Sequence, residues 1–405
     1  MNAQTIARVV RDRLAGIPER ATMPDAELRR LVEEQVESVQ DLPEFAVDED
    51  REKVRKVVLN DLLGFGPIQE LLDDPSISEI MVNGREAIYI ERSGVIDTSG
   101  SCFDSDEQLL RVIDRMVRSS GRRVDQSSPM VDARLPDGSR LNVVLPPLSV
   151  DGPAITIRKF TSSGLSTADL VDRGALSADA ATFLEEAVAA RMNILVSGGT
   201  GTGKTTVLNI LSSFIGENER VVTIEDAVEL SLRMPNLIRL EARPGNSEGA
   251  GEVHIRDLVR NSLRMRPNRI VVGEVRGAET IDMLQAMNTG HEGSLSTVHA
   301  NSPRDALRRL ETMILLAGVD LPLRAVREQA SSAIDLIVHL ARDARGRRFV
   351  TAITEVVGME SDVISTADLF SRDFALVRDA DSLPPLDRTG LVSQRLGMRR
   401  NRTAA

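Results

Sequence analysis

The residues best suited to chemistry form one glycine-rich stretch, Ser197-Gly198-Gly199-Thr200-Gly201-Thr202-Gly203-Lys204-Thr205-Thr206. Glycines let successive backbone N–H groups curve around a phosphate without interference from a β-carbon. A lysine at the end of such a loop reaches the terminal phosphates of a nucleotide, and a hydroxyl in the next position binds Mg²⁺. Lys204 and Thr205 hold these two positions. The stretch therefore predicts a site for a nucleoside triphosphate, with Gly198 to Thr206 as the binding residues.

The residues on either side provide the strand and the helix that this motif requires. An apolar run at 192–196 predicts a buried strand, and residues 205–215 predict a helix that ends at Gly216. The start of that helix adds a partial positive charge beside the phosphates. An ordinary glycine-rich turn would not combine a strand, a Lys-Thr pair and a helix in this order.

Carboxylates follow two further predicted strands. Glu225 and Asp226 come after the strand at 221–224, and Glu274 follows the strand at 270–272. Ligands of open α/β sheets bind at the carboxyl ends of the strands, so we expect these acids near the loop. An acid that ends a strongly apolar strand is costly unless it has a role. We predict that Glu274 orients water or holds Mg²⁺, either directly or through water, and that Glu225 and Asp226 assist it.

Two histidines flank the next predicted strand, at 294–298. His299 ends it and His291 precedes it, and both are candidate site residues together with Glu229. Each has an ordinary alternative, because a histidine can be a satisfied structural residue and a glutamate can be a surface or capping residue. The spacing leaves these alternatives open.

The remaining segments must position these groups. Apolar residues at helical spacing over 1–72 predict an N-terminal helical bundle or appendage. Short strands and one amphipathic helix predict an α+β domain over 73–160, followed by a linker at 161–170. Alternating helices and strands over 171–360 predict an α/β domain with a parallel sheet. Residues 361–405 are interpreted as a tail with a solvated basic end.

Composition excludes several classes of function. A net charge of −11 argues against broad binding of nucleic acid, and without tryptophan the chain has few platforms on which bases could stack. The single cysteine, Cys102, excludes an intrachain disulfide and a cysteine-clustered zinc site. Neither a membrane span nor a signal-peptide core is evident. If the protein works at a membrane, other proteins must therefore hold it there.

Four stretches in order carry a family resemblance: residues 198–206, Thr223-Ile224-Glu225-Asp226, residues 264–276 and residues 289–301. They resemble the Walker A motif, Asp box, Walker B motif and His box of the type II/type IV secretion ATPases. Within that group, Asp132–Arg140 and Arg304–Glu311 most resemble the CpaF-type tight-adherence (Tad) pilus ATPases. The missing CxxC pairs fit the Tad or the conjugation-like branch.

This resemblance implies a RecA-like P-loop NTPase domain that uses ATP and Mg²⁺, preceded by a PAS-like α+β domain and the helical bundle. It implies a cytoplasmic homohexamer held at the inner face of the plasma membrane by partner proteins, where it works with an inner-membrane platform protein and through it with pilins. The acidic charge and the scarcity of aromatic residues argue against direct contact with nucleic acid. It also implies that Arg140 and Arg158 reach the nucleotide from the α+β domain. Read from the sequence alone, either could be an ordinary ion-paired arginine.

The main interpretation is a hexameric motor that hydrolyses ATP to power Tad/type IV pilus assembly or type II-like secretion. The first alternative is a conjugation-type (type IV secretion) ATPase that handles DNA or protein export. The second is a nucleotide switch that does not hydrolyse ATP. Stimulation by DNA would favour the first alternative, and an absence of phosphate release would favour the second.

Overall fold

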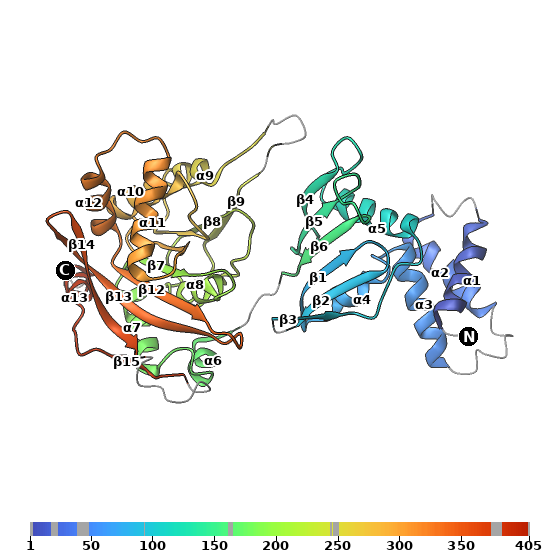
Figure 1. The fold of residues 1–405 in the computed structure, drawn as a ribbon, viewed down its shortest axis with the longest axis horizontal. Helices are drawn as coiled ribbons and strands as arrows, with labels where there is room; N and C mark the ends of the chain where they lie inside the picture. The colour runs from blue at the N-terminus through green and yellow to red at the C-terminus, as the bar shows by residue number, and fades with distance from the viewer. Residues whose placement is uncertain are drawn as a thin grey trace. The chain divides into compact units, whose positions relative to one another are not determined.

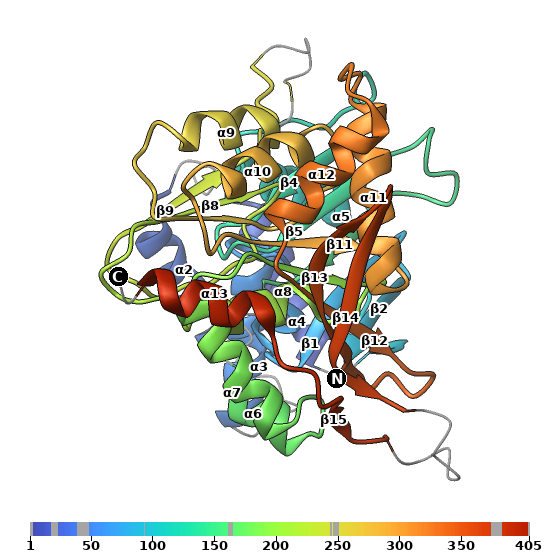
Figure 2. The same ribbon diagram turned by 90° about the vertical axis from the view of Figure 1, so that its left-hand side faces the viewer.

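A computed structural model describes residues 3–17, 23–38, 48–92, 94–160, 165–243, 245, 251–373 and 383–403 (Figures 1 and 2). The chain divides into two compact units, Met1–Thr161 and Ser162–Ala405. Each unit has buried apolar clusters of its own.

Three helices begin the first unit: α1 (Ala3–Ala15), α2 (Asp25–Glu37) and α3 (Asp48–Leu62). Ile6, Val10 and Leu14 recur every four residues, so they lie on one face of α1 and are buried against α2 and α3. The carboxylate of Asp61 accepts hydrogen bonds from Arg11 and from Gln108, which joins α1 and α3 to the region that follows.

A six-stranded antiparallel sheet forms the rest of the first unit, in the order β3-β2-β1-β6-β5-β4. Its strands are β1 (Ile77–Asn83), β2 (Ala87–Arg92), β3 (Val95–Thr98), β4 (Met130–Arg134), β5 (Arg140–Val144) and β6 (Ala154–Arg158). Helix α5 (Asp106–Ser119), capped by Ser105, and the short α4 (Ile68–Asp73) pack on this sheet. Strand β4 pairs antiparallel with β5 across the turn at Asp137-Gly138.

The second unit is built on a nine-stranded mixed sheet, in the order β15-β14-β13-β12-β7-β11-β10-β8-β9. The strands from β12 to β9 are parallel, and β13, β14 and β15 are added antiparallel to one another. Their bounds are β7 (Ile194–Gly198), β8 (Val221–Glu225), β9 (Leu237–Glu241), β10 (Arg269–Val272), β11 (Leu295–His299), β12 (Leu336–Arg342), β13 (Arg348–Glu360), β14 (Val363–Arg372) and β15 (Leu386–Arg388).

Helices cover both faces of this sheet (Figure 1). One face carries α7 (Ala178–Ala189), α8 (Lys204–Ser212) and α13 (Gln394–Thr403), and α6 (Thr167–Asp172) packs beside α7. The other face carries α9 (Ile255–Ser262), α10 (Glu279–Asn288), α11 (Pro303–Leu316) and α12 (Leu323–Ala333). Along the chain that the structure describes, no helix has both the length and the apolar character of a membrane span.

The end of the chain differs from the predicted tail. Strands β14 and β15 extend the sheet, and α13 is held on it by its basic residues. Arg395 and Arg399 lie 2.8 and 2.6 Å from the carboxylate of Asp335, which is 2% exposed. The sequence shows the positive charges but not the distant carboxylate that binds them. Within the predicted linker at 161–170, residues 161–164 lie outside the described residues, and α6 begins at Thr167 behind a capping box formed by Ser166 and Asp169.

Candidate nucleotide site

The glycine-rich loop leaves the carboxyl end of β7, which is buried along its whole length and pairs in parallel with β11 and β12. A β-carbon on Gly198 would lie 2.6 Å from the carbonyl oxygen of Leu340, so only glycine fits there. Gly201 and Gly203 have φ angles of +70° and +94°, a region that L side chains rarely adopt. The loop then runs into α8, whose amino end adds partial positive charge to the space above it.

Lys204 is held over this loop by partners that a phosphate could replace. Its Nζ donates to the carbonyl oxygen of Gly199 at 2.8 Å and lies 3.3 Å from Nδ1 of His299. Burial lowers the pKa of Lys204, and the nearby carboxylate of Glu274 opposes that shift. Neither a carbonyl nor an imidazole binds an ammonium as strongly as a charged oxygen does. The side chain is therefore placed to exchange these contacts for a phosphate.

Glu274 lies next to Lys204 within a chain of charged groups. Its Oε1 lies 3.0 Å from Nε2 of His299, and its Oε2 accepts a hydrogen bond from Arg276 at 2.8 Å. Burial lowers the pKa of His299, so the imidazole is mainly neutral at pH 7, although Glu274 acts in the opposite direction. Oε1 is buried and, among the described residues, accepts no hydrogen bond of good geometry. This side of the carboxylate therefore depends on its 3.0 Å contact with the imidazole of His299.

Glu225 lies at the end of the neighbouring strand but faces the backbone. Its Oε2 accepts hydrogen bonds from the N–H groups of Glu229 at 2.7 Å and Leu230 at 2.8 Å. Burial raises the pKa of Glu225, and these two hydrogen bonds partly offset the effect. A β-carbon on Gly273 would lie 3.0 Å from Cγ of Glu225, which explains the glycine before Glu274. The geometry favours a positioning role for Glu225.

The turn that Glu225 holds brings Glu229 to the loop. The hydroxyl of Thr205 donates to Oε2 of Glu229 at 3.2 Å. Asp226, next in the chain, is exposed and lies 3.6 Å from Arg276. The second unit thus brings Glu229 to the loop residues Lys204 and Thr205. It also connects Asp226 to Glu274 through Arg276.

His291 is not brought to the loop. It precedes the amino end of β11, whereas His299 ends the same strand, and β11 runs parallel to β7 with Leu295 opposite Ile194. A strand of five residues spans roughly 16 Å, so the two histidines lie at opposite edges of the sheet. The backbone oxygen of His291 accepts a hydrogen bond from Ser294 at 2.7 Å, whereas Nδ1 of its imidazole is buried without a hydrogen-bond partner among the described residues.

Arg140 and Arg158 belong to the first unit. They lie directly opposite each other on β5 and β6. The Nε atom of Arg158 lies 3.3 Å from the carboxylate of Glu79 on β1. The two arginines are therefore paired neighbours on adjacent strands of the antiparallel sheet. Their contact with a nucleotide stays a prediction.

Sequence reasoning missed two residues that order the site. Arg276 connects Glu274 to Asp226, and the hydroxyl of Thr297 donates to the carbonyl oxygen of Gly273 at 2.7 Å. Both lie two residues from a residue that was singled out, Glu274 or His299. Residues two apart in an extended chain point to the same side, and this spacing could have identified them.

The residues present also fit Mg²⁺. Among the described residues no three histidine, cysteine or acidic side chains cluster as a metal site. Mg²⁺ is usually held by one or two protein oxygens together with phosphates and water, so such a cluster is not needed. The hydroxyl of Thr205 and the carboxylate of Glu229, 3.2 Å apart, supply oxygens of this kind beside the loop.

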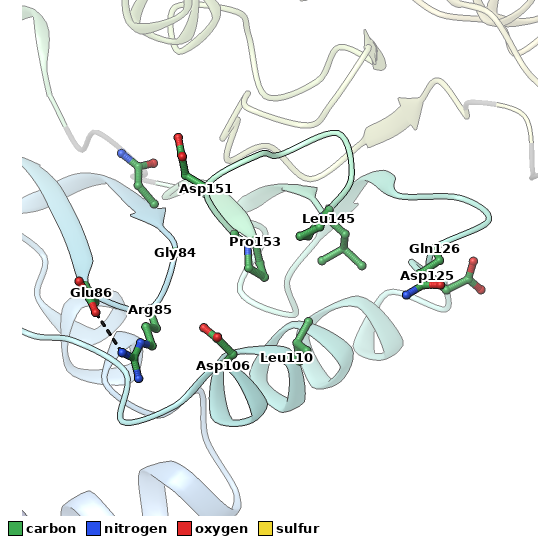
Figure 3. A pocket seen from close by; sticks show the side chains of 13 residues that line it. Gly84, Arg85, Glu86, Asp106, Leu110, Asp125, Gln126, Leu145, Asp151 and Pro153 are labelled. Carbon is green, nitrogen blue, oxygen red and sulfur yellow. Dashed lines mark hydrogen bonds and ion pairs between the residues drawn. The ribbon is translucent and has the colours of Figure 1, made fainter.

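A separate pocket of about 730 Å³ lies in the first unit (Figure 3). Asp106 and Leu110 of α5 form one wall, and Pro153 lies across from them. Asp125 and Asp151 also line the pocket. Its carboxylates would repel a phosphate, so it is not suited to the nucleotide.

Comparison with known proteins agrees with this geometry. The family model described as type II/IV secretion system protein matches residues 61–364. A putative conjugal transfer protein of Mycobacterium tuberculosis is 37% identical over 340 residues, which cover 82% of this chain and 96% of the relative. Conjugal transfer protein TrbB of Rhizobium radiobacter is 34% identical over 294 residues, covering 71% and 85%.

A solved structure shows the same fold. The pilus retraction motor PilT, crystallised with bound ADP, matches with a TM-score of 0.54 and 22% identity. The match covers 71% of this chain and 80% of PilT.

Proposed function

The chain belongs to the type II/IV secretion system protein family and is an ATPase, and on that premise we propose that it is the motor of a conjugation-type, type IV secretion apparatus. The names of its relatives support conjugal transfer. The observation that carries the motor chemistry is Glu274, whose buried Oε1 lies 3.0 Å from His299, itself 3.3 Å from Nζ of Lys204.

In the proposed mechanism, the loop amides and Lys204 bind the β- and γ-phosphates of ATP. Thr205 and Glu229 would hold Mg²⁺, which would neutralise charge on the phosphates. Glu274 orients the attacking water, and neutral His299 keeps the carboxylate in place. The spacing of 3.0 Å between Glu274 and His299 supports this division of roles.

We further infer that the second unit acts as a RecA-like core and that the chain works as a homohexamer. Arg140 and Arg158 of the first unit would contact the phosphates and couple hydrolysis to movement. Arginines that stabilise the transferring phosphoryl group typically raise the rate ~10³–10⁵-fold. The ring would lie in the cytoplasm against an inner-membrane platform protein.

A second candidate is a Tad pilus assembly motor of the CpaF type, which would act on pilins through the same platform. It is favoured by the stretches Asp132–Arg140 and Arg304–Glu311.

Deletion of this chain in its host separates the two candidates. Loss of transfer of a mobilisable plasmid to a recipient strain, with surface pili retained, supports the conjugation-type role. Loss of surface pili with normal plasmid transfer supports the pilus motor. Complementation with the wild-type chain and with the Lys204→Ala variant is the matched control, because only the chain that binds ATP should restore the lost property.

A further inference from the structure

The side of the loop that faces away from Glu274 carries two arginines that the site described above does not use. Strand β12 adjoins β7 on the side opposite β11, and it ends at Arg342. Strand β13 begins at Arg348, and the two residues lie directly opposite each other across the hairpin. Because β12 is parallel to β7, Arg342 emerges at the same edge of the sheet as the loop.

Both side chains lie against the loop glycines. A β-carbon on Gly201 would lie 3.4 Å from Nη1 of Arg342, and one on Gly203 would lie 3.7 Å from Cδ of Arg348. Nη2 of Arg342 would in turn lie 3.3 Å from a β-carbon on Gly346, in the turn of the same hairpin. The guanidinium of Arg342 therefore fits between two glycines, one in the loop and one in the turn.

The turn itself is held by other residues. The carboxylate of Asp343 accepts hydrogen bonds from the backbone N–H groups of Arg345 at 3.0 Å and Arg347 at 2.8 Å, and from Nε of Arg347 at 2.6 Å. Within the described ranges, neither Arg342 nor Arg348 has an ion-pair or hydrogen-bond partner through its side chain. Two exposed cations are thus presented on a braced hairpin, beside a loop built to hold an anion.

We propose that Arg342 and Arg348 bind the α- and β-phosphates of the nucleotide from the β12–β13 side of the loop. The groups suited to the γ-phosphate, Lys204, Glu274 and His299, lie toward β11 and β10. The opposite side is then left for the phosphates that ATP and ADP share. This inference rests on the loop as the nucleotide site, and it does not depend on which apparatus the motor serves.

The assignment predicts a particular kinetic pattern. A charge-assisted hydrogen bond contributes ~1.5–3 kcal/mol, which corresponds to a change of about tenfold or more in affinity. Arg342→Ala and Arg348→Ala should each raise the Kd for ADP and the Kd for ATP by about the same factor, roughly tenfold. The kcat at saturating ATP should stay close to that of the wild type, because contacts equal in ground and transition states alter only binding.

The test is calorimetric titration of the full-length protein with ADP and with a non-hydrolysable ATP analogue, together with kcat and KM for ATP. Arg345→Ala is the matched control, because it removes the same charge from the turn of the same hairpin, and its Kd should be unchanged. Arg342→Lys and Arg348→Lys should restore part of the affinity. Unfolding temperatures confirm that each variant is folded.

If the double variant Arg342→Ala/Arg348→Ala bound both nucleotides as tightly as the wild-type protein does, the inference would be overturned. The loop would still be upheld as the nucleotide site in that case, because both proteins would bind ADP. A lowered unfolding temperature with unchanged affinity would instead show that the arginines only brace the loop. Weaker binding of the ATP analogue alone, with a fall in kcat, would move the contact to the γ-phosphate and overturn the assignment to the shared phosphates.

Discussion

Two strand ends in the second unit, those of β8 and β10, carry a glutamate in opposite surroundings. Glu225 is 1% exposed and bonds to the backbone of its own turn. The side chain of Glu274 is 19% exposed and, among the described residues, is paired with the side chains of His299 and Arg276. The strands are adjacent and parallel, so the topology places both acids at one edge of the sheet.

The difference separates a residue that shapes the site from one that is placed to act in it. One oxygen of Glu225 accepts two backbone hydrogen bonds, and losing the carboxylate leaves those two N–H groups without this acceptor. The other oxygen of Glu225, like Oε1 of Glu274, is buried without a hydrogen-bond partner among the described residues, so the backbone hydrogen bonds are what distinguish the two acids. A carboxylate held by an imidazole and a guanidinium can exchange those contacts for water or metal-bound water. The comparison therefore predicts that Glu274 governs turnover and that Glu225 governs stability.

The largest expected effect is that of Glu274→Gln. Removing a residue that positions or activates water typically costs ~10²–10⁴-fold in rate. We expect kcat to fall by that amount, with ATP binding and unfolding temperature close to those of the wild type. Phosphate release at saturating ATP measures this. Asp226→Asn, which changes an exposed acid 3.6 Å from the same Arg276, is the matched control and should keep most of the activity.

The second effect concerns folding. Glu225→Ala leaves the N–H groups of Glu229 and Leu230 without their acceptor, and a buried unsatisfied group costs ~1–3 kcal/mol. We expect the free energy of unfolding to fall by about 2–4 kcal/mol in urea denaturation. Asp226→Ala, one residue away but exposed, should change it by less than about 0.5 kcal/mol. Equal losses in the two variants would contradict the structural role of Glu225.

The third effect is the pH dependence that Glu225 confers. Burial raises the pKa of Glu225 above its ordinary value of 4.5. The folded protein then binds this proton more tightly than the unfolded chain, so stability falls as the pH rises from 4.5 through the folded pKa. Relative to Glu225→Gln, the wild type should lose unfolding free energy over that window. Urea denaturation at a series of pH values measures the difference between the two proteins.

The smallest effect is that of His299 on the pH dependence of the free energy of unfolding, and its sign is opposite to that of Glu225. Burial lowers the pKa of His299 below its ordinary value of 6.5, so the unfolded chain binds this proton more tightly. Its contribution to stability is present above pH 6.5 and is lost as the pH falls through the folded pKa. Relative to His299→Asn, the wild type should therefore gain stability as the pH rises. A slope of the same sign as that of Glu225 would contradict the assigned environments.

Much of the site could be predicted because its residues are local to strand ends. The loop needs glycines at 198, 201 and 203, and the acids after β8 and β10 are brought to it by parallel pairing alone. The direction of β11 determines which of the two candidate histidines lies near the loop. His291 and His299 flank the same strand, and only the one at its carboxyl end reaches Lys204.

The remainder depends on partners that are distant in the sequence. Arg395 and Arg399 suggested a solvated tail, but they pair with Asp335 more than fifty residues earlier. The distinction between Glu225 and Glu274 also could not be predicted, because each simply follows an apolar strand in the sequence. What separates them is a turn that folds the backbone of Glu229 and Leu230 onto one carboxylate.

The most direct test of this account is the rate of phosphate release per folded, ATP-bound molecule, measured in a single turnover for Glu274→Gln and Glu225→Gln side by side. The account predicts that Glu274→Gln binds ATP but releases phosphate at least a hundredfold more slowly, about the lower limit of the ~10²–10⁴ range. Glu225→Gln should stay within about tenfold of the wild type, a difference of ~1.4 kcal/mol in the barrier. Near-normal release from Glu274→Gln, with the larger loss in Glu225→Gln, would contradict it.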